Sequence, residues 1–139
     1  MISSSTSSAE REGFQQRLYP QAVDPRTLSP VALAFVGDGV YELMVRERLA
    51  CEANRPGGAL HRRAVSLVRA EAQSAAMERL LPLLTAEEAA VYRRGRNAHT
   101  TRTGDDYHRA TGLEALFGYL YLQGEIGRLR ALFAAAMED

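Results

Sequence analysis

LSPVALAFVGDGVYELMVRERLACE, residues 28–52, predicts one long helix. Ser29 can cap its start, and Pro30 suits the first helical position because that position needs no backbone N–H donor. The helix is apolar on nearly every side, which is typical of a helix that passes through a core. It nevertheless carries a lone carboxylate, Asp38, between two glycines. A carboxylate in a core must be compensated by a cation, a metal or hydrogen bonds, so Asp38 is a candidate functional residue.

A second carboxylate has the same setting further along the chain. Glu114 is the only acidic residue in RATGLEALFGYLYL, residues 109–122, which is otherwise mainly apolar. Two carboxylates on two central helices can meet at one point and hold Mg²⁺ through their oxygen atoms. Alternatively, each could pair with a buried arginine, and the pattern alone leaves both interpretations open.

The remaining sequence predicts further helices and no alternating strand pattern. The spacing of apolar residues predicts helices over 59–81, 85–95, 107–124 and 125–139. We therefore expect an all-α fold. The length predicts one domain over residues 18–139, preceded by a Ser-rich, disordered tail over residues 1–17.

Basic side chains are concentrated in two segments, although the formal net charge of the chain is zero. The segments are 55–79 and 93–109, and they contain arginine but no lysine. Arginine suits bidentate contacts with phosphate, and duplex RNA is gripped mainly through phosphates and 2′-hydroxyls. The alternative is a solvated basic surface. The residues expected to contact RNA are Arg62, Arg69, Gln73, Arg93, Arg94, Arg96, Asn97 and His99.

Four stretches resemble the ribonuclease III family. LAFVGDGVYE, residues 33–42, resembles the family's signature helix, and GLEALFGYLYL, residues 112–122, resembles its second metal-binding helix. AEAQ at 70–73 and YRRGRNAHT at 92–100 are closer still to the Mini-ribonuclease III branch, which consists of the catalytic domain alone. The resemblance extends from about residue 28 to the end of the chain.

The resemblance assigns roles to individual residues. Asp38 and Glu114 match the two carboxylates that hold the catalytic Mg²⁺ in the family. The family's glutamate four residues before the first of these is Ala34 here, and its aspartate three residues before the second is Thr111. The number of metal ions therefore stays open. Glu42, one helical turn after Asp38, is a further candidate ligand.

The resemblance also implies a function. It implies a homodimeric, Mg²⁺-dependent endoribonuclease that hydrolyses double-stranded RNA to 5′-phosphate and 3′-hydroxyl ends. For the miniature branch, the implied substrate is precursor 23S (large-subunit) ribosomal RNA, and a ribosomal protein is a conceivable partner. A separate double-stranded RNA-binding domain is not expected. No apolar run is long enough to span a membrane, so we expect a cytoplasmic protein.

Two functions of other classes compete with the nuclease. The first is a helical RNA-binding or ribosome-assembly module on the same fold, catalytically impaired by the loss of the two family acids. The second is a protein-interaction domain whose carboxylates form buried ion pairs, which predicts no affinity for RNA. Magnesium-dependent cleavage of RNA separates these alternatives from the nuclease.

Overall fold

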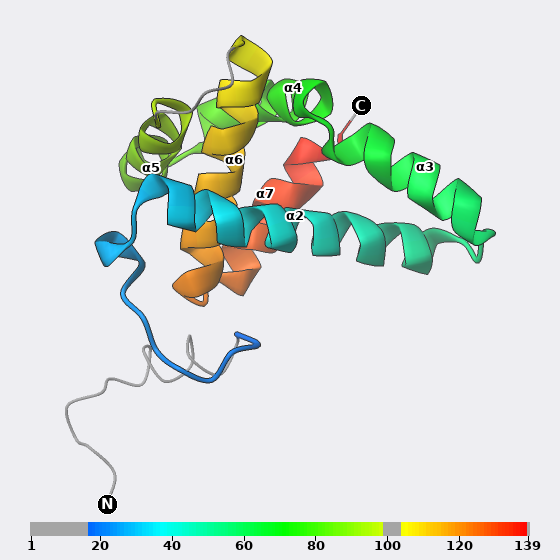
Figure 1. The fold of residues 1–139 in the computed structure, drawn as a ribbon, viewed down its shortest axis with the longest axis horizontal. Helices are drawn as coiled ribbons and strands as arrows, with labels where there is room; N and C mark the ends of the chain where they lie inside the picture. The colour runs from blue at the N-terminus through cyan, green and yellow to red at the C-terminus, as the bar shows by residue number, and fades with distance from the viewer. Residues whose placement is uncertain (1–16, 99–103, 139) are drawn as a thin grey trace, which may run out of the picture.

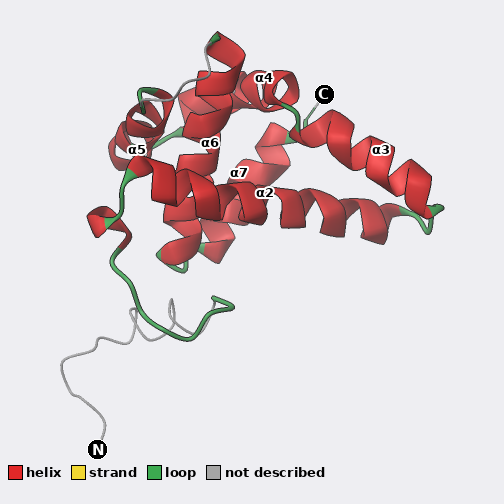
Figure 2. Cartoon of the chain, viewed as in Figure 1, coloured by secondary structure: helices red, strands yellow, loops and turns green. Residues whose placement is uncertain are grey.

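The computed structural model describes residues 17–98 and 104–138, and every regular element in these ranges is helical (Figure 2). The all-α expectation is confirmed. None of the described helices combines the length and apolar character that a membrane crossing requires. The tail expected over residues 1–17 lies outside the described residues apart from Arg17. The elements are η1 (Pro25–Thr27), α2 (Pro30–Glu52), α3 (Gly57–Val68), α4 (Ala70–Leu80), η2 (Leu81–Leu83), α5 (Ala86–Arg96), α6 (Asp105–Leu122) and α7 (Ile126–Ala136).

Capping residues begin two of these helices where the sequence predicts. The Ser29 hydroxyl accepts a hydrogen bond from the backbone N–H of Ala32 at 3.1 Å, so α2 starts directly after it. Thr85 and Glu88 form a capping box at the start of α5, each side chain accepting from the backbone N–H of the other. These bonds satisfy backbone donors that the first helical turn leaves free.

α6 is the central helix of the bundle. Its residues 112–120 are buried except for Glu114, and α2, α4, α5 and α7 all pack against it. α2 crosses α6, and α3 folds back along the outer half of α2, so that these two helices project from the bundle as an arm (Figure 1). The core includes Tyr41, Met77, Tyr92, Phe117 and Leu132.

The helix predicted over 59–81 is wrong as a single element. α3 ends at Val68 and α4 begins at Ala70, because Arg69 between them has an extended backbone with φ −66° and ψ 159°. Neither a proline nor a glycine marks this break in the sequence. Because of this change of direction the two helices pack on different partners: α3 packs along α2, whereas α4 packs on α6.

Candidate active site

Two glycines allow α2 and α6 to cross with their backbones in contact. A Cβ atom at Gly37 would overlap the carbonyl oxygen of Glu114, and one at Gly118 would lie 2.9 Å from the backbone nitrogen of Gly37. Real Cβ atoms essentially never come within 3.0 Å of such atoms, so a larger residue would force the helices apart. Gly39 is different, because a Cβ there would meet nothing within 4 Å. The close crossing brings Asp38 beside Glu114.

A second pair of glycines holds α6 against α5. A Cβ atom at Gly112 would lie 2.6 Å from the ring of Tyr92, and one at Gly95 would lie 2.6 Å from the Cβ atom of Ala115. Glu114 therefore lies on a helix that is fixed closely on two sides. Such support limits the freedom of its backbone and defines where its side chain begins.

The side chain of Asp38 lies close enough to Glu114 at this crossing to change the pKa of the Glu114 carboxyl. The pKa of Glu114 is raised to about 8, first by burial and then by the negative charge of Asp38. Two adjacent carboxylates cannot both ionise without a cost, so near neutral pH the pair retains a proton. A divalent cation can replace that proton, because it compensates both negative charges.

Asp38 is exposed, so the expectation of a buried carboxylate is wrong for this residue. Val31 and Phe35, which precede it on the same side of α2, are also exposed. Apolar residues around a whole helix do not distinguish a helix in the core from one whose outer side is left uncovered in the protomer. Glu114 is half-buried, so the carboxylate pair lies where a buried helix crossing reaches solvent.

In the part of the chain that the structure describes, neither carboxylate is paired with an arginine. The ion pairs within residues 17–98 and 104–138 all involve other acids, such as Glu88 with Arg128 at 2.8 Å, and none includes Asp38 or Glu114. The structure therefore does not support the interpretation in which these two carboxylates form buried structural ion pairs.

Gln73 lies beside the carboxylate pair and is not on the RNA-facing surface. Its side chain is 2% exposed, and it lies close enough to Glu114 to lower the pKa of that carboxyl. The expectation that it grips RNA together with Arg62 and Arg69 is therefore corrected. The break at Arg69 explains the difference, because a continuous helix would have kept Gln73 in register with the exposed arginines.

A third acidic ligand is not found at the crossing. Glu42 instead pairs with Arg46, four residues later, at 3.1 Å. In the described parts of the chain, no three His, Cys, Asp or Glu side chains gather into a group that could hold a metal. Ala34 is buried, and the Thr111 hydroxyl donates to the carbonyl oxygen of Tyr107 at 3.0 Å. Within the described ranges, the acidic side chains at the crossing are therefore Asp38 and Glu114, and Glu42 is left out of the candidate set.

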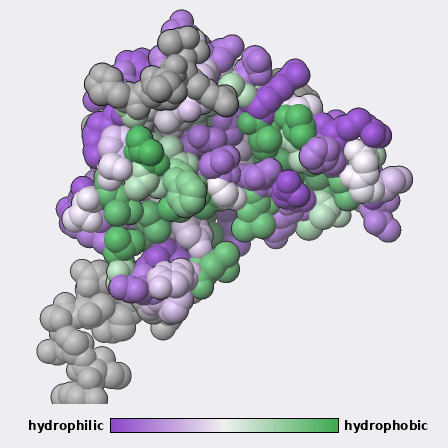
Figure 3. Space-filling view, viewed as in Figure 1, coloured by the Kyte–Doolittle hydropathy of each residue, from purple (hydrophilic) through white to green (hydrophobic). Residues whose placement is uncertain are grey.

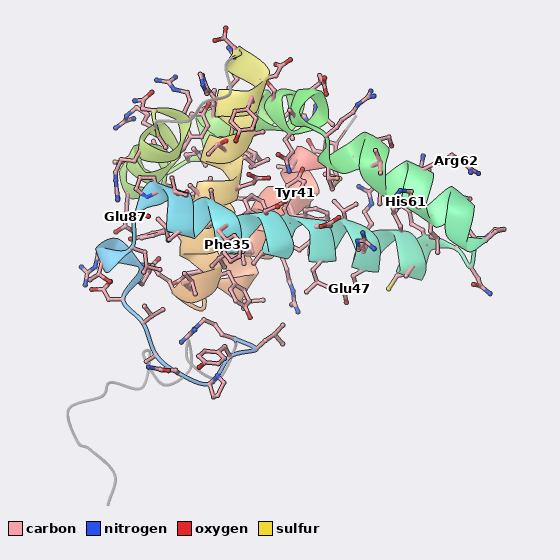
Figure 4. All side chains as sticks on the ribbon, viewed as in Figure 1. Phe35, Tyr41, Glu47, His61, Arg62 and Glu87 are labelled. Carbon is pink, nitrogen blue, oxygen red and sulfur yellow. The ribbon has the colours of Figure 1, made fainter. Side chains whose placement is uncertain are left out.

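The expected basic residues lie at two exposed places. Arg93, Arg94, Arg96 and Asn97 occupy the last turn and the C-cap of α5, and the Arg96 guanidinium lies 5.9 Å from the ring centroid of Tyr92. Arg62 and Arg69 are exposed on α3 and at the start of α4, and Arg62 projects from α3 away from α2 (Figure 4). His99 lies outside the described residues.

An apolar surface lies along α2, and its residues could not be told apart from core residues in the sequence. Phe35 is 83% exposed, and Leu43 on the same helix is 53% exposed. Beside them lies a groove of about 560 Å³, lined mainly by apolar residues of α2 and α7. Apolar side chains are visible over α2 on the face shown in Figure 3. The groove is lined in part by Val36, Val40, Met44, Leu129 and Phe133.

Comparison with known proteins identifies the family of the chain. The Ribonuclease III domain family matches residues 31–125, which include both carboxylates. The Mini-ribonuclease 3 of Thermoanaerobacter sp. is 43% identical over 117 residues, covering 81% of this chain and 82% of that protein. The Mini-ribonuclease 3 of Synechococcus sp. is 50% identical over 111 residues, covering 77% and 78%. A crystal structure of a Fusobacterium nucleatum protein matches with a TM-score of 0.72 at 27% identity, covering 81% of this chain and 94% of that one. Because the match extends over most of the chain, the chain is an endoribonuclease of the ribonuclease III family and belongs to its Mini-ribonuclease 3 branch.

Proposed function

We propose that this endoribonuclease cleaves double-stranded RNA with a Mg²⁺ ion held by Asp38 and Glu114. The observation that carries the proposal is that these two carboxylates, from α2 and α6, lie close together and neither is paired with a cationic side chain of residues 17–98 and 104–138. Mg²⁺ is usually bound through one or two carboxylates and keeps several waters. A pair of carboxylates that opens to solvent at Asp38 fits this binding mode.

The chemistry assigns a separate task to each residue. When bound, the cation supplies positive charge that acidifies an attacking water and stabilises the charge that develops on the phosphoryl oxygens. Glu114 must release its proton first, because only an ionised carboxylate is an effective ligand. Asp38 is exposed, so an RNA phosphate can approach from the solvent side. The expected products carry 5′-phosphate and 3′-hydroxyl ends.

We further propose that the exposed arginines position the RNA backbone. Arg93, Arg94 and Arg96 with Asn97 form one group, Arg62 and Arg69 form the other, and His99 remains a prediction. Replacing Arg94 and Arg96 together by alanine should weaken binding to many RNA sequences. The plot of log affinity against log salt should become flatter by roughly one unit for each phosphate that the variant no longer neutralises. The control is Arg26→Ala, because Arg26 is an exposed arginine paired with Asp24. An unchanged slope in the double variant would favour the alternative, in which these arginines are only a solvated basic surface.

A homodimer is part of the same proposal. Phe35 projects from α2 beside the apolar groove, so one surface carries both a projection and a hollow. In a two-fold assembly each copy could place its Phe35 against the partner's groove, because a two-fold interface uses the same surface of both copies. Such an assembly would also provide two carboxylate pairs for the two strands of one duplex.

The specific substrate that we propose is precursor 23S ribosomal RNA, cut at its paired ends in the cytoplasm, with a ribosomal protein as an additional partner. This proposal rests on the likeness to the Mini-ribonuclease 3 branch. Cleavage of precursor ends should be faster than cleavage of an unrelated duplex of equal length. Equal rates on both RNAs would contradict this choice of substrate.

A paired experiment tests the proposed nuclease. Asp38→Asn and Glu114→Gln nearly preserve shape but remove charge, so cleavage of double-stranded RNA with Mg²⁺ should fall by orders of magnitude while the melting temperature without metal is kept or rises. The double variant should be little worse than either single variant, because residues that act as one unit are not additive. A folded Asp38→Asn protein that cuts at the parental rate would contradict the mechanism. A parent protein that binds RNA but does not cut it would favour the impaired binding module.

A further inference from the structure

We infer that residues 17–24, here called the N-terminal strap, form part of the contact surface for a second copy of the chain. The inference rests on the homodimer proposed above and adds to it a segment that precedes the helices. Leu18 of the strap is one of the residues that line the apolar groove beside α2. The wall of the groove is therefore incomplete without the strap.

A hydrogen bond holds the strap against the end of α6. The backbone N–H of Leu18 donates to the hydroxyl oxygen of Tyr121 at 2.6 Å, and Tyr121 also lines the groove. The Arg17 guanidinium donates to the backbone carbonyl oxygen of Gln21 at 2.7 Å, which closes a turn within the strap. The strap thus passes the C-terminal end of α6 before the chain enters α2 (Figure 1). The position of Leu18 is set by its backbone contact and not by burial of its side chain.

The side chain of Leu18 is left uncovered in the protomer. It is 83% exposed, the same fraction as Phe35, and these are the highest values among the large apolar residues that the structure describes. A single exposed leucine is common in proteins, but Leu18 lines the same groove as the exposed Leu43. Apolar side chains gathered around one hollow are typical of a surface that binds a partner.

The charges in the groove favour a second copy as that partner. Glu47 and Arg130 both line the groove, and within residues 17–98 and 104–138 neither belongs to an ion pair. A two-fold interface brings the same surface of both copies together, so an acid and a base on one copy can each meet the opposite charge on the other. A partner without charges would instead cover Glu47 and Arg130 without compensation.

Sedimentation equilibrium of full-chain variants measures the dissociation constant of the dimer. Leu18→Ser removes the apolar side chain from the wall of the groove, and Tyr121→Phe removes only the hydroxyl that holds the strap. Leu81→Ser is the control, because Leu81 is an exposed apolar residue of η2 that does not line the groove. Phe14→Ser tests another occupant, the stretch of this chain that precedes the strap. Circular dichroism reports whether each variant is folded.

Leu18→Ser should raise the dissociation constant by about 100-fold, because burying a leucine is worth roughly a factor of ten or more and both copies lose it. Tyr121→Phe should raise it by roughly tenfold, since both copies lose the hydrogen bond. Leu81→Ser and Phe14→Ser should match the parent.

Three outcomes would contradict this account in different ways. A parental dissociation constant in folded Leu18→Ser would overturn the inference and leave the homodimer intact, and the same result in Tyr121→Phe would overturn the role of the hydrogen bond. A tighter dimer in Phe14→Ser would assign the groove to the chain's own preceding stretch. A parent protein that sediments as a monomer would overturn the homodimer itself.

Discussion

Replacing Gly37 by alanine should separate α2 from α6 and disturb the carboxylate pair. The added Cβ would overlap the carbonyl oxygen of Glu114 and lie 2.8 Å from the backbone nitrogen of Gly118. Both neighbours are backbone atoms, so no side-chain rotation can relieve the overlap. The helices must therefore move apart by roughly 1.5 Å, and overpacking of this kind typically costs about 1–3 kcal/mol.

The expected loss of stability is partly offset by helix propensity. Alanine is favoured over glycine inside a helix by roughly 0.8–1.0 kcal/mol, so the net loss should be about 0–2 kcal/mol. For a domain of this size, each kcal/mol corresponds to roughly 3–4 °C in melting temperature. Activity should fall further than stability, because a displacement of about 1 Å at a catalytic group can reduce the rate by roughly 100-fold.

Thermal unfolding followed by circular dichroism measures the first effect, and cleavage of double-stranded RNA below the unfolding temperature measures the second. Gly127→Ala on α7 is the matched control, since a Cβ there meets nothing within 4 Å. It should leave the melting temperature unchanged or raise it. A Gly37→Ala protein as stable as the parent and equally active would refute the role of the close crossing.

Three further predictions concern residues other than the two close-packed glycines and the carboxylate pair. Tyr41→Phe should leave the free energy of unfolding unchanged or raise it by up to roughly 1 kcal/mol, because the buried hydroxyl has no hydrogen-bond partner in the described structure. A clearly lower melting temperature would argue against this. The pKa of Glu88 is lowered, chiefly by its hydrogen bonds from Arg128, so the stability it contributes is complete above about pH 4.5 and is lost as pH falls through its lower folded value. The difference in melting temperature between the parent and Glu88→Gln should therefore be largest near neutral pH and shrink in acid, and a difference independent of pH would disprove the linkage. Phe35→Glu should give a monomer in sedimentation, whereas Val65→Glu, at an exposed apolar residue of α3 outside the groove, should remain a dimer.

Local signals in the sequence predicted much of the helical framework. Ser29 with Pro30, and Thr85 with Glu88, mark helix starts because their side chains satisfy backbone groups within one turn. The end of α6 was also predictable, since Gly124 follows it with a positive φ of 76°. Interactions of this kind involve residues that are close in the sequence, so a pattern can identify them.

Contacts between distant segments were harder to predict. Gly37 and Gly39 flank Asp38 symmetrically in the sequence, yet only Gly37 contacts another helix. The exposure of Asp38 depends on what covers α2, and a single helix does not carry that information. The burial of Gln73 on α4 follows the break at Arg69, which has no proline or glycine to mark it.

The most direct test of the central claim is a calorimetric titration of Mg²⁺ into the metal-free protein at several pH values, repeated with Asp38→Asn. The raised pKa of Glu114, about 8, means that binding below this pH must displace a proton. Affinity should therefore fall by roughly tenfold for each pH unit below about 8, with up to one proton released per ion bound. Asp38→Asn should stay folded and lose most of the affinity. Binding that is independent of pH, or equally tight in folded Asp38→Asn, would contradict the assignment of the metal to this carboxylate pair.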